Sequence, residues 1–176
     1  MARWLWYFWI YSFLGWGLEK GFAAVTRAEN QQRKCFLFLP LCPVYGLGML
    51  AVLALPPELS RGGWLIVSGG LAATAVEYAV HWGYEALLGV RFWDYSHVPG
   101  NWNGRVCPPF TLAWGVLTAA AVWLLQPGVA ALAARIPAAV TYLALLAFTA
   151  DAVCSARLLQ VTGDVKALRL YTTWNR

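Results

Sequence analysis

The chain has 176 residues, of which 60% are hydrophobic and only 12% are charged. Soluble domains carry about 25% charged residues, so this composition argues against a soluble globular protein. The net charge of +5 does not indicate a nucleic-acid partner, because the basic residues gather in the connections between apolar segments and at the C-terminus. We therefore predict an all-α, polytopic membrane helix bundle that forms one integral membrane domain over residues 1–176.

Five apolar segments predict membrane-crossing helices, each of which needs about 20 largely apolar residues. The 11 Trp and 8 Tyr residues fit helices that end at the membrane interface, where amphipathic rings anchor. In chain order, we expect helices over Trp4–Val25, Phe36–Leu55, Trp64–Val90, Phe110–Leu125 and Pro137–Leu159. The fourth helix is expected to end at Gln126, Pro127 and Gly128.

The distribution of basic residues predicts the orientation of these helices. Five crossings place the two termini on opposite sides of the membrane. One side would carry Arg27, Arg33, Lys34, Arg91, Arg105, Lys166, Arg169 and Arg176, and the other only Arg3, Arg61 and Arg135. The positive-inside rule then predicts a cell-membrane protein with its N-terminus outside and its C-terminus in the cytoplasm.

The segment Phe92–Phe110 stands out between the apolar segments, because it is dense in Trp, Asn, Asp, Arg, Gly, Pro and Cys. So many donors and acceptors on a short connection predict a structured polar loop between the third and fourth helices. Irregular backbone at membrane depth is tolerated only where protein or a watery cavity surrounds it. We expect this loop to cap the cytoplasmic side of the bundle. Its polar residues Asp94, Asn101 and Arg105 would meet carboxylates from the helices.

Three acidic residues, Glu19, Glu77 and Asp151, lie farther inside the apolar segments than Glu85 does. A charged group at the membrane centre costs about 2.5–3.5 kcal/mol on insertion scales, so such groups usually face the bundle interior and have a partner. For Glu19, the alternative is a snorkelling pair with Lys20 near the helix end. For Asp151, we expect a partner on another element, and Arg105 is a candidate that would hold the polar loop against the bundle.

Glu77, His81 and Glu85 recur every four residues, which places them on one face of a helix. Such a stripe could bind a cation or relay protons, with Asp94 or Asp151 as a further ligand. The alternative is that His81 and Glu85 face water at the helix end or are satisfied locally. We favour the alternative for His81 and assign no metal site.

The segment Leu39–Gly48 cannot be a regular helix throughout, because Pro40 and Pro43 each remove a backbone donor and clash with the preceding turn. Broken helices of this kind recur at transporter binding sites. Alternatively, the prolines only begin the helix, where proline is tolerated. Both interpretations stay open from the sequence.

The four cysteines show neither a CxxC pair nor zinc-ligand spacing. We expect Cys35, Cys42, Cys107 and Cys154 to be free thiols, since free cysteine commonly packs as a small hydrophobic residue. A bridge between Cys42 and Cys107 remains the alternative.

Several motifs occur together in one order: YSFLGWGLE at 11–19, LPLCPVYGLG at 39–48, EYAVHWGYE at 77–85, WDYS at 93–96 and NWNGRVC at 101–107. With these motifs the chain resembles the CmpB-like permeases, a family of small bacterial integral membrane proteins labelled ABC-transporter type IV. The resemblance runs from about Tyr11 to Asp151. The chain departs from the family pattern at Leu39, where glycine is usual, and at His81, where a small residue is usual.

The resemblance implies that two groups of residues fill family-pattern positions. The polar group, which we expect to line a cavity, consists of Glu19, Glu77, Glu85, Asp94, Tyr95, Asn101, Arg105 and Asp151. The group that we expect to shape the chain consists of Pro40, Pro43, Tyr45, Gly46, Trp93, Gly104 and Cys107.

The sequence contains no P-loop, GxSxG elbow, HExxH pair or dinucleotide fingerprint. Our leading hypothesis is a permease or transport-related protein with a polar intramembrane cavity and an unassigned substrate. The alternatives are a structural subunit of a membrane complex and a membrane-embedded enzyme or lipid-binding protein. In the latter, Glu77 or Asp94 would act as acid or base and Arg105 would hold a lipid phosphate.

We lean against an enzyme, assign no catalytic residue and expect no cofactor. The expected partners are membrane lipids and a separate ATPase subunit or a second copy of the chain.

Overall fold

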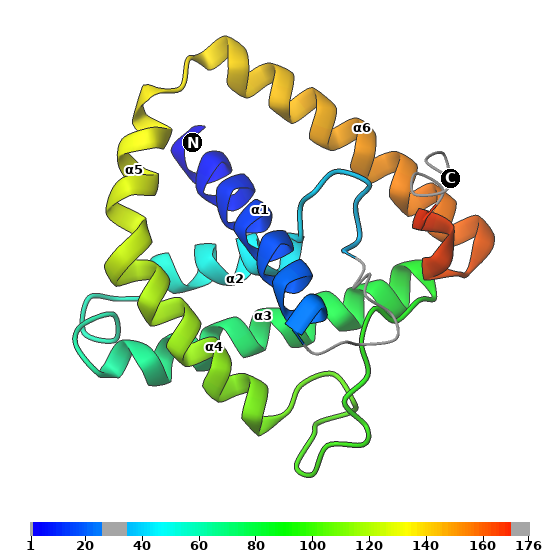
Figure 1. Cartoon of the computed structure of the whole chain (residues 1–176), viewed down its shortest axis with the longest axis horizontal. Helices are drawn as coiled ribbons and strands as arrows, with labels where there is room; N and C mark the ends of the chain where they lie inside the picture. The colour runs from blue at the N-terminus through cyan, green and yellow to red at the C-terminus, as the bar shows by residue number, and fades with distance from the viewer. Residues whose placement is uncertain (1, 26–34, 170–176) are drawn as a thin grey trace.

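The computed structural model describes residues 2–25 and 35–169. Over this part the chain is all-α apart from one isolated β-bridge between Trp102 and Val106. In chain order, the helices are α1 (Ala2–Val25), α2 (Pro43–Leu53), α3 (Trp64–Leu88), α4 (Pro108–Ala120), α5 (Gln126–Arg135) and α6 (Ala138–Thr162), followed by the 3₁₀ helix η2 (Val165–Arg169) (Figure 1). The basic residues Arg27, Arg33 and Lys34, which the prediction of orientation used, lie outside the described residues.

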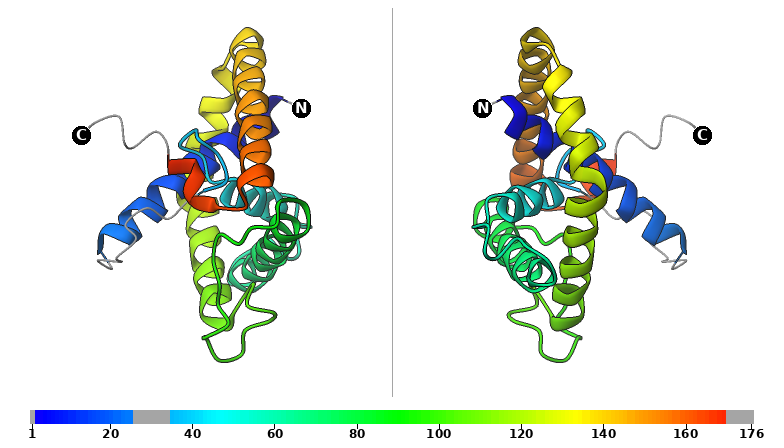
Figure 2. Two further views of the ribbon diagram at one scale, coloured as in Figure 1. Left: turned by 90° about the vertical axis from the view of Figure 1, so that its right-hand side faces the viewer. Right: turned by 90° about the vertical axis from the view of Figure 1, so that its left-hand side faces the viewer.

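Helices α1 to α4 form the packed part of the molecule, with α1 against α2, α2 against α3, and α3 against α4. Helix α5 packs on α1, whereas α6 runs back along the edge of the molecule and touches α1 and α3 at few points. Viewed edge-on, α1 is oblique to the other helices, so that its C-terminal end projects from one side (Figure 2). The end of α6 returns to the end of α3, where Gln160 Nε2 donates a hydrogen bond to the Leu87 carbonyl at 3.4 Å.

Glycine allows the close crossing of α1 and α2. A Cβ atom on Gly15 would overlap the ring of Tyr45, and one on Gly46 would overlap Ser12 and the Phe8 backbone. Close approach through small residues is a common way for apolar helices to associate in lipid. The crossing places Tyr45 of α2 directly beneath the Glu19 end of α1.

The second apolar segment differs from the predicted helix over Phe36–Leu55. Helix α2 begins only at Pro43, which occupies the first helical turn, and residues 35–42 are irregular. Pro43 therefore begins a helix, as one interpretation predicted, while Pro40 lies in an irregular stretch, as the other predicted. An 11-residue helix covers about 16 Å, roughly half of a bilayer core. The expected count of about five transmembrane helices is therefore not confirmed.

In residues 35–42, several backbone donors find acceptors without a helix. The Asp151 carboxylate of α6 accepts hydrogen bonds from Phe38 N at 3.1 Å and Leu39 N at 2.9 Å. Cys42 N donates to the Ser12 carbonyl of α1 at 2.8 Å. A single carboxylate thus replaces two helical acceptors, which makes an irregular backbone tolerable in apolar surroundings.

The fourth segment also differs from the prediction, because the helix does not end at Gln126–Gly128. It continues from Pro108 to Arg135 over 28 residues. A π-helical turn over Ala121–Leu125 precedes Pro127, and Gln126 N donates to the carbonyl of Ala121, five residues back. Proline cannot donate to the fourth preceding carbonyl and its ring crowds that carbonyl, so the wider turn absorbs both effects and α5 continues.

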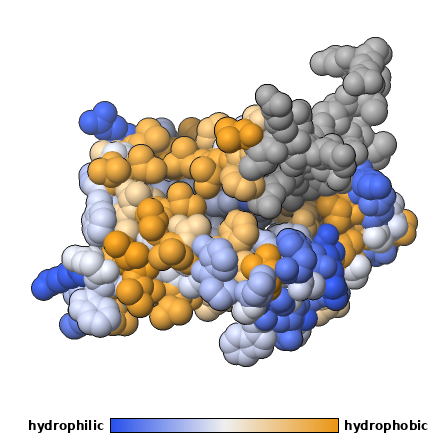
Figure 3. Space-filling view, turned by 60° about the horizontal axis from the view of Figure 1, so that its bottom comes forward, coloured by the Kyte–Doolittle hydropathy of each residue, from blue (hydrophilic) through white to orange (hydrophobic). Residues whose placement is uncertain are grey.

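Among the described residues, two helices are long and apolar enough to cross a membrane, namely Pro108–Arg135 and Ala138–Thr162. Within the most apolar 18-residue stretch of each helix, only 22% and 17% of the stretch is buried inside the molecule. Leu124, Leu143 and Leu146 are among their exposed side chains. Figure 3 shows a broad hydrophobic surface with a compact hydrophilic area at one side. A core helix of a soluble protein would bury most of such an apolar stretch. The outward apolar faces therefore favour a lipid environment.

The crossing of α1 and α2 yields a matched test on one helix. Gly15→Ala is expected to lower the free energy of unfolding by about 1–3 kcal/mol, because the new methyl group overlaps Tyr45. Gly17→Ala is expected to be neutral or to stabilise by up to about 1 kcal/mol, since nothing lies within 4 Å of its Cβ and alanine favours helix. Thermal unfolding in mild detergent, followed by circular dichroism, measures both. Equal stability of the two variants would contradict the close crossing.

Candidate functional site

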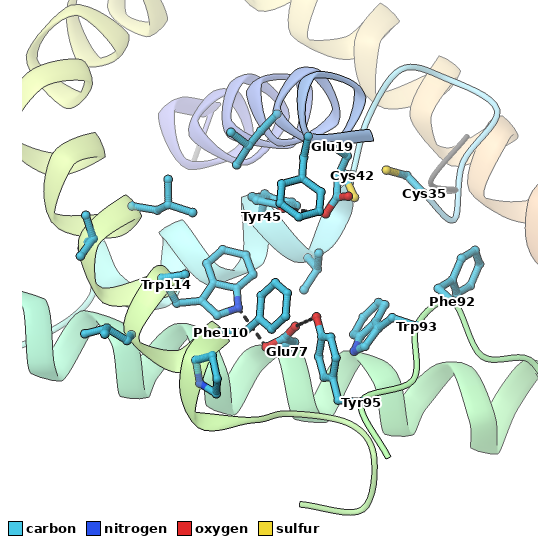
Figure 4. Close-up of a pocket in the computed structure, with 18 residues that line it drawn as sticks. Glu19, Cys35, Cys42, Tyr45, Glu77, Phe92, Trp93, Tyr95, Phe110 and Trp114 are labelled. Carbon is cyan, nitrogen blue, oxygen red and sulfur yellow. Dashed lines mark hydrogen bonds between the residues drawn. The ribbon is translucent and has the colours of Figure 1, made fainter. Parts of the chain in front are cut away.

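A cavity of about 620 Å³ lies between α1, α2, α3, α4 and the polar loop (Figure 4). Its volume is in the range of small-molecule sites, about 300–1,000 Å³. The wall is mostly aliphatic and aromatic, and its acidic side chains are Glu19 and Glu77. The aromatic residues of the wall are Phe22, Tyr45, Phe92, Trp93, Tyr95, Phe110 and Trp114.

Glu77 is 4% exposed and lies in the middle of α3. Tyr95 of the polar loop donates its hydroxyl hydrogen bond to Glu77 Oε1 at 3.2 Å. Trp114 of α4 donates its indole N–H to Glu77 Oε2 at 2.9 Å. The carboxylate therefore joins three elements, and a buried carboxylate requires such donors because its desolvation is costly.

Glu19 lies near the C-terminal end of α1 on the opposite side of the cavity (Figure 4). Tyr45 of α2 donates its hydroxyl hydrogen bond to Glu19 Oε1 at 2.7 Å. The Tyr45 ring contacts the Trp114 ring, with centroids 4.9 Å apart. Glu19, Tyr45, Trp114 and Glu77 thus form a continuous series of contacts across the cavity. Lys20, the expected alternative partner of Glu19, lies near the Trp16 ring, 5.9 Å from its centroid.

A second polar cluster lies outside the cavity, where the loop meets the end of α3. Arg105 contacts Glu85 Oε2 through Nε at 2.9 Å and Nη2 at 2.8 Å, and its Nη1 donates to the Tyr78 hydroxyl at 2.8 Å. Arg91 also pairs with Glu85. The hydrogen bond to Glu85 raises the pKa of Arg105, with a further rise from the hydrogen bond to Tyr78 against an opposing effect of desolvation. The guanidinium therefore stays charged and fastens the loop to α3.

His81 links this cluster to the loop backbone. Its Nε2 lies 2.9 Å from the Trp93 carbonyl, and Trp93 Nε1 donates to the Arg105 carbonyl at 2.9 Å. His81 is 2% exposed, so the expectation that it faces water is wrong, while local satisfaction through Trp93 agrees with the structure. Its Nδ1 lies 3.4 Å from Glu85. Over the described residues, no group of three or more His, Cys, Asp or Glu side chains is placed to hold a metal ion.

Asp94 and Asn101 organise the loop from within. Asp94 Oδ1 accepts from Ser96 Oγ at 2.5 Å and from Ser96 N at 2.8 Å, and these hydrogen bonds lower the pKa of the Asp94 carboxyl. Asn101 Oδ1 accepts from Gly104 N at 2.9 Å, and its Nδ2 donates to the Val98 carbonyl at 2.8 Å. Gly104 has φ +68°, and a Cβ there would lie 2.5 Å from Ser96 Oγ. Only glycine fits this turn without strain.

Asp151 lies away from the cavity and the loop. Besides the backbone donors of Phe38 and Leu39, it accepts from Ser155 Oγ at 3.1 Å. The expected pair with Arg105 is therefore not formed, because Arg105 binds Glu85 and Tyr78 instead. The expectation that the loop residues Asp94, Asn101 and Arg105 meet the carboxylates of Glu19, Glu77 and Asp151 is also wrong. The reason is that each of these loop residues has its partners within the loop or at the end of α3.

The predicted site residues thus separate into groups. Those on the cavity wall are Glu19, Glu77 and Tyr95, together with Tyr45 and Trp93 from the shaping group. The others of the predicted cavity group, which hold the loop or the 35–42 stretch, are Glu85, Asp94, Asn101, Arg105 and Asp151.

Sequence reasoning missed Trp114 and Phe110 as cavity residues. A tryptophan in the middle of an apolar helix carries an N–H donor that needs an acceptor, and this signal could have identified Trp114.

Cys42 also lines the cavity. All four cysteines are free, so the alternative Cys42–Cys107 bridge is absent from this structure.

The fold and the cavity define a small α-helical protein whose most apolar helices are long enough for a membrane and which encloses a solute-sized site. The sequence profile of the family described as "Putative ABC-transporter type IV" matches residues 6–156. The chain therefore belongs to this family, and the resemblance inferred from the motifs is confirmed. The family description suggests an ABC-transporter component. No curated protein and no solved structure matches the chain.

The Arg105 cluster yields a test of loop attachment. Arg105→Lys is expected to loosen residues 92–106, because lysine cannot reach Glu85 and Tyr78 together in the planar geometry of the guanidinium. Arg91→Lys is the matched control, since Arg91 is 60% exposed and its pair is screened by water. Hydrogen exchange of the loop amides is expected to accelerate strongly in Arg105→Lys and little in Arg91→Lys. Unchanged exchange in Arg105→Lys would show that the loop holds its place without this cluster.

Proposed function

We propose that the chain is a multi-pass membrane component of an ABC-type transport system and that the cavity between α1, α2, α3 and α4 is its solute-binding site. The cavity carries this proposal, because it combines a solute-sized volume and an apolar wall with buried polar groups at fixed positions. Family membership supports a transport role. The sequence has no P-loop, so coupling to ATP would come from a separate subunit.

The lengths of the helices support the multi-pass location. Helices α1, α3 and α6 have 24, 25 and 25 residues, and the helix over 108–135 has 28. Each is long enough for a hydrocarbon core of about 30 Å at 1.5 Å per residue. Membrane lipids would contact the exposed apolar faces of α4, α5 and α6.

The position of Arg105 favours transport over the lipid-enzyme alternative. That alternative needs a cation in the cavity to hold a lipid phosphate. Arg105 instead binds Glu85 and Tyr78 outside the cavity wall. Over the described residues, the wall also contains no Lys, Arg or His side chain. The hypothesis of an anionic ligand held by Arg105 therefore has no support from this geometry.

The orientation of the chain can be tested with reporters at both termini. We expect alkaline phosphatase to be active when fused to the N-terminus and green fluorescent protein to fluoresce when fused to the C-terminus. Five crossings require that residues 35–42 and α2 together span the membrane once. Termini on the same side of the membrane would contradict the proposed orientation and would indicate that α2 enters and leaves by one side.

Filling the cavity tests the solute site. We expect the neutral fluorescent probe N-phenyl-1-naphthylamine to bind saturably to the protein in nanodiscs, above the signal of empty nanodiscs. Ala113→Trp places a large ring in the cavity wall and is expected to abolish saturable binding. Ala75→Trp, on the exposed face of α3, is the matched control and should bind as the unmodified chain does.

The same pair of variants tests transport. Inverted membrane vesicles from the source cells are expected to accumulate the probe in an ATP-dependent manner with the unmodified chain and with Ala75→Trp, but not with Ala113→Trp. Equal accumulation in all three, together with non-saturable binding, would contradict a solute-binding function for the cavity.

A further inference from the structure

We propose that Cys35 and Cys42 form a redox-sensitive thiol pair, which closes to a disulfide when glutathione disulfide oxidises it and thereby lowers the affinity of the cavity for its solute. The oxidation site stands on the placement of the two thiols, whereas its effect on the solute rests on the proposed function. Neither cysteine is in a disulfide in this structure.

The backbone between the two cysteines has the form of an arch, residues 35–42, which runs out from the packed helices and returns to them (Figure 1). Cys35 lies at its first foot and Cys42 at its second, directly before α2. In a regular helix, seven residues separate two Cα atoms by about 10.5 Å. A disulfide joins Cα atoms about 4.4–6.8 Å apart, which the two feet of an arch can reach and a helix cannot.

Three observations place the two thiols together beside the end of α3. Both cysteines line the same cavity. The Tyr84 hydroxyl of α3 interacts electrostatically with both of them, and the Tyr84 ring packs on Phe36 with centroids 5.3 Å apart. Figure 4 shows the Cys35 side chain pointing from its foot of the arch toward Cys42. The two thiols therefore face one another across the base of the arch.

The crown of the arch and its second foot are fastened to other helices. Asp151 of α6 accepts hydrogen bonds from Phe38 N and Leu39 N, at 3.1 and 2.9 Å. Cys42 N donates to the Ser12 carbonyl of α1 at 2.8 Å. A disulfide would fasten the Cys35 foot to this fixed part and would draw Cys35 across the cavity wall.

The exposure of the two cysteines sets the order of the reaction. Cys35 is partly exposed and Cys42 is buried, so glutathione disulfide meets Cys35 first. The Cys35 thiolate attacks one sulfur of glutathione disulfide, forms a mixed disulfide and releases one glutathione thiolate. The Cys42 thiolate then attacks the Cys35 sulfur and releases the second glutathione thiolate. The two protein thiols lose two protons and two electrons, which reduce glutathione disulfide to two molecules of glutathione.

The proposed orientation of the chain places the arch toward the cytoplasm, where glutathione keeps thiols reduced. The thiol form is therefore the resting form, and the disulfide forms when the glutathione pool becomes oxidised. Both cysteines belong to the cavity wall, so oxidation and solute binding change the same surface. Such coupling is reciprocal, because a solute that favours the reduced wall also opposes oxidation.

The test of the oxidation site uses the full chain in nanodiscs, one copy in each, in glutathione buffers of increasing oxidised fraction. After denaturation, the reduced chain is expected to take up four maleimide groups, one for each cysteine, and the oxidised chain only two. Peptide mass spectrometry should assign the disulfide to Cys35 and Cys42. Cys35→Ser should form no disulfide, whereas Cys154→Ser, at an exposed position of α6, is the matched control and should form it.

A second variant tests the order of the reaction. Cys42→Ser removes the thiol that resolves the mixed disulfide, so it is expected to retain one glutathione on Cys35. Cys35→Ser should retain less glutathione, because Cys42 is buried. More glutathione on Cys35→Ser than on Cys42→Ser would overturn the assignment of Cys35 as the first thiol.

The effect on the cavity is measured with N-phenyl-1-naphthylamine and the same samples. We expect oxidation to raise the Kd of this probe by about fivefold in the unmodified chain and in Cys154→Ser, which is the low end of typical coupling between two sites. The Kd should not depend on the glutathione buffer in Cys35→Ser.

Each contrary result has a distinct meaning. Four maleimide groups at every glutathione ratio, or a disulfide that contains Cys107 or Cys154, overturns the proposal. If the Cys35–Cys42 disulfide forms and the Kd stays the same, control of the cavity is overturned. If the probe binds to neither form saturably, the proposed function fails, and the maleimide count still decides the oxidation site. Should Cys42→Ser not fold, Cys35→Ser decides both effects.

Discussion

The cavity depends on the hydrogen-bonding requirement of one carboxylate, that of Glu77. A buried carboxylate without donors would cost several kcal/mol, so the surrounding elements must supply them. The donors come from Tyr95 of the polar loop and Trp114 of α4, while Glu77 itself belongs to α3. The same interaction thus closes the loop over the helices and places a negative charge on the wall. Tyr45 and Glu19 extend this arrangement to α2 and α1.

A second requirement shapes the chain before α2. Residues 35–42 are irregular before the helix begins at Pro43, and the backbone donors of Phe38 and Leu39 are satisfied by Asp151 of α6. Asp151 thus ties the peripheral helix to the packed helices, which it otherwise touches at few points. Polar residues at apolar depth in this protein therefore fall into two classes. Some complete the backbone, and others face the cavity.

The polar loop illustrates what a sequence pattern can and cannot predict. Its density of donors, acceptors and turn residues correctly predicted a structured segment between α3 and α4. Its pairings were not predictable, because Arg105 reaches Glu85 and Tyr78 only through the turn at Asn103 and Gly104, both with positive φ. The expected contacts with Glu19, Glu77 and Asp151 assumed a loop that points inward. The internal bonds of Asp94 and Asn101 close the loop on itself instead.

By itself, the sequence determined the helical class, the family and the positions of the carboxylates, because apolar length and motif order are local properties of the chain. For the segment with Pro40 and Pro43 it left two interpretations open, and the structure assigns Pro40 to an irregular stretch and Pro43 to the start of α2. Tertiary structure alone decided which carboxylates share a cavity, because Trp114, Tyr95 and Glu77 meet only through the packing of α3, α4 and the loop. It also decided that the helix continues past Pro127, since a π turn can absorb the proline. The polar loop, the most distinctive part of the sequence, contributes Tyr95 and Trp93 to the cavity, while its charged residues hold it in place.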